Sequence, residues 1–195
     1  MEVALGTKAH SGWAALVVIA KRNGEYVVVD RRRIELVEDE WAKQPYHAAE
    51  NLKPDAARAL VEKGLTAAHK IAVQQIKATI DRERERKNKV KSCGLLVGQP
   101  MPEWTTDEIL AVHFRMHKAE GVLFRNALAQ ASKKCRLNLV EIPESQLIEC
   151  AEKSLKISAS GLMKTIAALG KSVGPPWGKD QKEATLAAMI ALAHE

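Results

Sequence analysis

The chain has 195 residues, of which 46% are hydrophobic and 28% are charged. This length suits one domain, residues 1–195, with a substantial core, and the composition excludes a disordered or collagen-like chain. Lys and Arg number 30 against 24 Asp and Glu, and the net charge of +6 favours a polyanionic partner such as nucleic acid.

The cysteines and apolar runs indicate a cytoplasmic protein. Cys93, Cys135 and Cys150 lie far apart, form no Cys-x-x-Cys pair, and are interpreted as small hydrophobes in a reducing compartment. We see no basic-then-apolar leader, and the longest apolar run, residues 13–20, is too short to span a bilayer. We therefore expect no membrane partner.

The first third of the chain is typical of strands. Residues 3–5 open it, residues 14–20 are continuously apolar like a strand buried on both faces, and residues 26–34 continue the pattern. Asn23-Gly24 favours a type I′ hairpin turn between the last two. We predict three strands in an antiparallel meander.

A long helix is expected next. Residues 39–54 are polar, contain two prolines, and are predicted to be a loop. From Asp55, just after Pro54, apolar residues recur at helical spacing until residues 81–87, whose alternating charges are typical of a solvated helix end. The apolar stripe comprises Val61, Leu65, Ala68, Ala72 and Ile76.

Strands and helices alternate in the second half. Residues 93–98 indicate a buried strand, the Thr-x-x-Glu capping box from Thr105 to Glu108 opens a long helix, and residues 137–142 form the next strand. The expected buried face of that helix is Ile109, Val112, Met116, Ala119, Leu123 and Ala127. Three more helices are predicted over residues 145–155, 159–171 and 180–193.

This order of elements predicts an α/β fold. A run of strand, helix, strand, helix and strand requires parallel pairing with right-handed crossovers. We predict a mixed five-stranded sheet, three antiparallel strands followed by two parallel ones, with helices on both faces.

Four segments carry a resemblance to the RuvC-like family of junction nucleases, within the ribonuclease-H-like superfamily. Residues 5–12 lie where the family has a Gly-Ile-Asp-Pro-Gly-Ser turn, and residues 119–122 are similar to its Ala-Arg-Gly-Val segment. Residues 140–147 resemble its Glu-Tyr-Ala-Pro-Thr-Gln-Val strand exit, and residues 180–187 its Asp-x-x-Asp-Ala-Leu-Ala helix opening. The resemblance implies a ribonuclease-H-like fold over nearly the whole chain, Holliday-junction DNA as partner, a role in DNA recombination, and a homodimer.

The resemblance also implies an acidic site, which is degenerate here. The family cleaves phosphodiesters with two divalent metals held by four acidic groups, because hard cations prefer clustered carboxylates. The first acid corresponds to Lys8, or to Thr7 with a one-residue slip, and the second falls on Gly98. Asp180 and Glu183 match the last pair, and are the candidate catalytic residues and ligands for Mg²⁺ or Mn²⁺.

Each of these candidates has a structural alternative. Asp180 and Glu183 form an Asp-x-x-Glu pattern at a helix start, and we favour capping over metal binding. Lys8 and His10 could bind a phosphate directly in place of the metals, although exposed polar groups of an ordinary turn are the favoured interpretation. On the strands, Glu141 and Asp30 are carboxylates that could rebuild a shifted acidic site.

Other side chains are candidates for DNA or metal contact. Trp177, in a Pro-Pro-Trp-Gly loop, could stack on an unpaired base or pin the loop to the body, and both interpretations stay open. His113 and His117 have the spacing for a shared metal ion, but no third ligand is apparent, so a helix-surface role is favoured. The basic candidates for contact with DNA are Lys133, Lys134, Arg136 and Lys179.

Three functional hypotheses follow. The leading one is a RuvC-like pseudoenzyme that binds branched or structured DNA without efficient cleavage. The second is an Mg²⁺- or Mn²⁺-dependent endonuclease with a rearranged carboxylate site, which three or more carboxylates in one pocket would support. The third is a protein-interaction scaffold that keeps only the fold.

Overall fold

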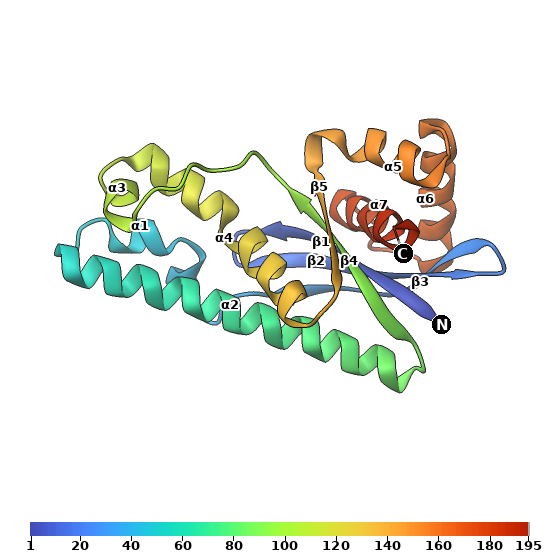
Figure 1. Ribbon diagram of the computed structural model, residues 1–195, viewed down its shortest axis with the longest axis horizontal. Coiled ribbons are helices and arrows are strands. Elements are labelled where there is room, and N and C mark those ends of the chain that lie inside the picture. Colours follow the sequence, from blue (N-terminus) through green and yellow to red (C-terminus); the bar gives the residue numbers. More distant parts are fainter. Residues whose placement is uncertain (195) are drawn as a thin grey trace.

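The computed structural model describes residues 1–194 and contains one mixed five-stranded sheet. Strands β1 (Glu2–His10), β2 (Trp13–Arg22) and β3 (Glu25–Glu35) form the expected antiparallel meander. Strands β4 (Lys89–Val97) and β5 (Asn138–Pro143) add in parallel beside β1, which gives the order β3-β2-β1-β4-β5 (Figure 1). The predicted α/β sheet is confirmed.

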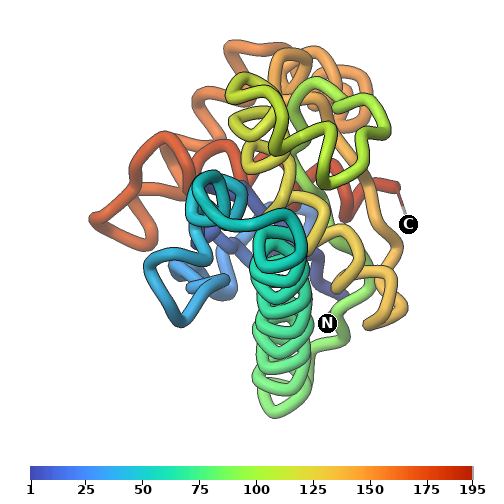
Figure 2. The backbone as a smooth tube through the Cα atoms, turned by 90° about the vertical axis from the view of Figure 1, so that its left-hand side faces the viewer, coloured from blue at the N-terminus to red at the C-terminus, as the bar shows by residue number. Residues whose placement is uncertain are grey.

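Helices cover both faces of the sheet. One face packs on α2 (Pro54–Glu85) and α4 (His113–Lys134), and the other on α5 (Leu147–Leu155), α6 (Ala159–Val173) and α7 (Lys179–Ala193) (Figure 1). Figure 1 shows α2 along the lower side of the molecule, and Figure 2 shows its C-terminal end projecting below the other elements. None of the helices within residues 1–194 has the length and apolar character needed to cross a membrane.

Local sequence explains the turn between β2 and β3. Asn23 and Gly24 adopt φ values of +53° and +87°, as a type I′ turn between β2 and β3 requires. A bulge follows in β3, where Val18 of β2 pairs with Asp30 but the next residue pairs with Val28. The bulged residue Val29 directs its carbonyl to Arg86, at the end of α2, at 3.4 Å.

The predicted loop over residues 39–54 is wrong in part. It contains a 3₁₀ turn (Glu40–Lys43) and the short helix α1 (Pro45–Ala49). Pro45 begins α1 at a position where its missing N–H costs nothing, so a residue taken as a helix breaker is a helix start.

The predicted long helix from Thr105 is also wrong in part, because it is two helices. The capping box at Thr105 is confirmed, but α3 (Thr106–Leu110) ends before α4 begins. Val112 between them is extended and 40% exposed, so it does not belong to the buried face. The guanidinium of Arg115 in α4 donates a hydrogen bond to the carbonyl of Glu108 at 2.9 Å. In a continuous helix this carbonyl would accept a backbone N–H of the next turn instead.

A separate apolar cluster joins α1, α3 and the beginnings of α2 and α4 at one end of the molecule (Figure 1). Its buried members are Tyr46, Ala49, Ala57, Val61, Ile109, Met116 and Ala119.

Candidate functional site

The C-terminal end of β1 presents Lys8 to α7. Alternate residues of a strand point to opposite faces, so Leu5 packs toward α2 and α4 whereas Gly6 and Lys8 face α7. Lys8, rather than Thr7, therefore lies on the face of β1 that carries α7, with Asp180 and Glu183. Lys8 is only 6% exposed.

Two paired glycines allow α7 to approach the sheet closely. Gly6 pairs with Gly94 across β1 and β4. A Cβ on Gly6 would lie 1.8 Å from the carbonyl oxygen of Ala184, and one on Gly94 would lie 2.1 Å from that of Ala187. The backbone of α7 therefore rests directly on the strands, which brings its first turns beside Lys8.

Three carboxylates surround the Lys8 ammonium. Nζ forms a short hydrogen bond with Glu183 and lies 3.1 Å from Oε1 of Glu144 and 3.4 Å from Oδ1 of Asp180. His10 places Nε2 3.1 Å from the same Asp180 oxygen and stacks on Trp13. We call Lys8, Glu144, Asp180 and Glu183 the lysine cluster.

Hydrogen bonding keeps Lys8 charged. Burial by itself would lower the pKa of Lys8, but hydrogen bonds and Coulombic attraction from Glu183 and Glu144 outweigh it, so the pKa rises above its ordinary value of 10.5. Lys8 is therefore an ammonium at neutral pH, with its donors directed at carboxylates rather than at solvent.

A second cation lies beside Gly98, the position at which the resemblance implies a second acid. A Cβ on Gly98 would lie 2.3 Å from Nη1 of Arg125, so the guanidinium of Arg125 fills the space that a side chain there would need. Nη2 of Arg125 also lies 3.6 Å from Oε2 of Glu144. The two positions at which the resemblance implies acids therefore carry or adjoin positive charge, Lys8 directly and Gly98 through Arg125.

The capping-box part of the interpretation of Asp180 and Glu183 is wrong, although Asp180 does lie in the first turn of α7, where the helix dipole favours an acidic charge. Gly178 is the N-cap of α7, and its N–H donates to the side chain of Gln181 at 3.0 Å. Asp180 and Glu183 instead face Lys8, at 28% and 19% side-chain exposure.

Sequence reasoning missed Glu144, the third carboxylate of the lysine cluster. It follows directly after β5, and the carboxyl ends of parallel strands meet at one edge of a sheet, so its place after Pro143 was an available signal.

The other predicted residues do not join the lysine cluster. Glu141 is exposed on β5 and lines a hollow with Arg125, and Asp30 pairs with Arg32 of its own strand. Three basic residues lie at the end of α4 and just before β5, at the opposite end of the strands from Lys8: Lys133, Lys134 and Arg136.

Trp177 has clear structural contacts. Its Nε1 donates to the carbonyl of Ile166 at 3.1 Å, and its ring lies against Gly170, where a Cβ would come within 2.3 Å. Arg31 donates to the carbonyls of Val173 and Pro175 and so holds the same loop. These contacts favour the loop-pinning interpretation, and the base-stacking one remains a prediction.

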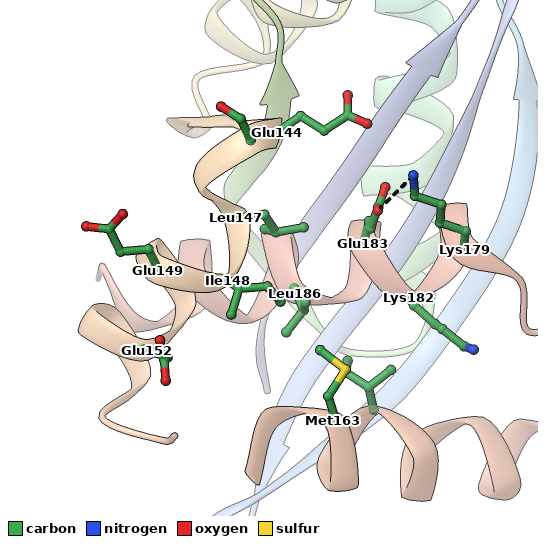
Figure 3. Close-up of a pocket in the computed structure, with 12 residues that line it drawn as sticks. Glu144, Leu147, Ile148, Glu149, Glu152, Met163, Lys179, Lys182, Glu183 and Leu186 are labelled. Carbon is green, nitrogen blue, oxygen red and sulfur yellow. Dashed lines mark ion pairs between the residues drawn. The ribbon is translucent and has the colours of Figure 1, made fainter. Parts of the chain in front are cut away.

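A cavity of about 640 Å³ adjoins the lysine cluster between α5, α6 and α7. Figure 3 shows Glu144 and Glu183 at its border, with Leu147, Leu186 and Met163 on its walls. Lys179, 76% exposed, lies 3.7 Å from Glu183 on its rim.

A two-metal site of the kind that the resemblance implies does not fit these residues. The ammonium of Lys8 already lies among the carboxylates that would have to hold the ions, and Arg125 fills the space beside Gly98. A divalent cation there would meet a fixed positive charge at short range in a half-buried setting, where Coulombic repulsion is strong.

Comparison with known structures defines the fold class. No protein-family model matches the sequence, and no curated protein matches it either. The structure is similar to Thermus thermophilus RuvC, with a TM-score of 0.51 and 10% identity over 98% of this chain and 94% of that chain. It is likewise similar to T. thermophilus RuvC in complex with a Holliday junction substrate, with a TM-score of 0.51 and 9% identity over 100% of this chain and 94% of that chain.

The chain therefore has a ribonuclease-H-like α/β fold. Within that class it has the RuvC-like arrangement, as the four resembling segments indicated. At such low identity, the likeness establishes the fold alone.

Proposed function

We propose that this protein binds branched or structured DNA through a RuvC-like domain and does not cleave it efficiently. The lysine cluster carries the proposal, because an internal ammonium occupies the place where metal ions would be held. The similarity to a RuvC solved with a Holliday junction substrate supports the choice of substrate class.

Charge neutralisation gives the proposal a physical basis. Clustered carboxylates repel a phosphate backbone unless cations neutralise them. Here Lys8, Arg125 and Lys179 face the carboxylates Glu144, Asp180 and Glu183, so positive and negative side chains balance without added metal. DNA binding at this edge is therefore expected to need no divalent cation.

One gel experiment tests the proposal. Labelled four-way junction and matched duplex are incubated with the protein, with and without Mn²⁺, and both binding and cleavage are read. We expect a junction complex with and without Mn²⁺ and no product. A homodimer is part of the proposal, and sedimentation of the complex measures it.

The second candidate, a metal-dependent endonuclease, is favoured by one observation: three carboxylates converge. It requires Lys8 to leave them. Mn²⁺-dependent junction cleavage that Asp180→Asn abolishes would establish it and overturn the first proposal. A protein that shifts neither junction nor duplex at low salt would instead support the scaffold role.

A further inference from the structure

Three histidines converge away from the lysine cluster, and we call His47, His113 and His117 the histidine cluster. His47 lies on α1, and His113 and His117 lie on the first two turns of α4. One ligand nitrogen from each can be chosen so that all three lie within 4.8 Å of one another. The ring centres are 4.5 to 5.0 Å apart, and three imidazoles around one tetrahedral ion have centres about 5 Å apart.

A buried carboxylate sets the orientation of His47. Nδ1 of His47 lies 2.6 Å from Oε2 of Glu120, whose side chain is 5% exposed. The other carboxylate oxygen of Glu120 accepts the backbone N–H groups of Tyr46 and His47, each at 3.1 Å. Glu120 thereby fixes α1 against α4 and favours the His47 tautomer with its proton on Nδ1.

The free nitrogen of His47 is left for a ligand. Nε2 of His47 is buried and has no hydrogen-bond partner among the described residues. An unpartnered buried nitrogen costs free energy unless something binds it.

The other two histidines present nitrogens to each other. Nε2 of His117 lies 3.1 Å from Nε2 of His113, while Nδ1 of His113 lies 3.5 Å from Oε1 of Glu50. A carboxylate therefore stands behind the Nδ1 of two of the three rings. This carboxylate–histidine arrangement is the one that supports metal-binding imidazoles.

We propose that His47, His113 and His117 bind one divalent transition-metal ion of the Zn²⁺ type. Three imidazoles suit zinc, and the nearby carboxylates of Glu120 and Glu50 favour a cation. The fourth position is left to water, because His113 and His117 are solvent-exposed. This site is independent of the proposed DNA binding.

The ion would fasten α1 to α4. Helix α1 has only five residues and is joined to α4 through the apolar cluster and Glu120. His47 also lines a hollow with Ser11, the residue after β1, so the ion would brace the segment beside the turn between β1 and β2.

Metal binding is tested on untagged, chelator-treated full-length protein. With Zn²⁺ alone we expect one ion per chain, and with Co²⁺ the intense visible absorption of a four-coordinate ion. At about a hundredfold excess of Zn²⁺ over its Kd, the Tm is expected to rise by about 5–10 °C. Mg²⁺ should produce neither effect at this site.

Variants locate the ion. His113→Ala and His117→Ala change exposed side chains, should fold, and are expected to abolish the Co²⁺ absorption and the Tm rise. Glu120→Gln is expected to weaken Zn²⁺ binding by about 10- to 100-fold. His69→Ala, on α2 and outside the histidine cluster, is the matched control and should bind as the parent does.

Two outcomes overturn the proposal. One is a parent protein that binds no stoichiometric Zn²⁺. The other is binding that persists unchanged in both His113→Ala and His117→Ala, which would place the ion elsewhere, for example on the cysteines.

Discussion

The lysine cluster and the histidine cluster differ in what occupies their centres. In the lysine cluster, carboxylates that could hold a metal already surround the ammonium of Lys8. In the histidine cluster, carboxylates lie behind the rings of His47 and His113, and the buried Nε2 of His47 has no partner among the residues described. If metal sites were predicted from the number of acidic residues, the lysine cluster would be the predicted site. The ammonium of Lys8 already neutralises its carboxylates, however, so we expect the metal ion at the histidine cluster.

The largest expected effect comes from separating α7 from the sheet. Gly6→Ala places a methyl group against the backbone of Ala184, and we expect a loss of about 3 kcal/mol in the free energy of unfolding. Zn²⁺ binding at the histidine cluster should survive in the folded fraction. Urea denaturation measures the loss.

Gly121→Ala is the matched control for that change. Gly121 lies within α4, and an added Cβ would meet no atom within 4 Å. Because alanine is the better helix former, this variant should be more stable by up to about 1 kcal/mol. Equal losses in Gly6→Ala and Gly121→Ala would contradict the close contact of α7.

Removal of the Lys8 ammonium should make the stability of the protein depend on an added divalent cation. Lys8→Met leaves three carboxylates without their ammonium, and we expect the free energy of unfolding to fall by about 2 kcal/mol at neutral pH. This loss is smaller than that for a fully buried ion pair, because the carboxylates are partly exposed. Added Mn²⁺ should restore part of the lost stability. The exposed Lys179→Met is the control, with at most about 0.5 kcal/mol lost. A Lys8→Met protein indifferent to Mn²⁺ would show that the carboxylates cannot hold a cation.

A change outside both clusters sharpens the contrast. Trp177→Phe removes the hydrogen bond to the Ile166 carbonyl, and we expect about 1 kcal/mol of destabilisation. The response to Zn²⁺ and the junction affinity should match those of the parent if Trp177 pins the loop. A clear loss of junction affinity would favour the base-stacking interpretation.

The smallest effect is a pH dependence specific to Lys8. Burial lowers the pKa of Lys8, but the hydrogen bonds that its ammonium donates to Glu183 and Glu144 raise this pKa above 10.5. The stabilisation is therefore complete below pH 10.5 and is lost as the pH rises through the folded-state pKa. The difference in unfolding free energy between parent and Lys8→Met, followed into alkaline solution, should narrow there, and a constant difference would contradict the ion pairing.

The sequence was most informative where local chemistry decides the structure. The turn at Asn23-Gly24, the capping box at Thr105 and the division into three antiparallel and two parallel strands follow from neighbouring residues and connection rules. The interruption between α3 and α4 at Val112 could not be predicted in this way, because it depends on how α3 packs in the apolar cluster that it forms with α1, α2 and α4.

The sites depended on longer-range packing. The resemblance pointed to Asp180 and Glu183 but not to Glu144, whose part depends on the edge where the parallel strands end. His47 lies in a segment taken for a loop, and nothing in its spacing connects it with His113 and His117. Only the packing of α1 on α4 brings the three rings together.

The bulged edge strand β3 has a consequence for assembly. It is the longer of the two outer strands, and an outer strand offers unpaired backbone groups to any second chain. Here the bulge at Val29 interrupts the regular pairing pattern of that edge, Arg86 covers the Val29 carbonyl, and Arg31 joins the strand to the loop after α6. A continuous ten-stranded sheet formed through β3 is therefore disfavoured, and two copies that associate are expected to do so through helices.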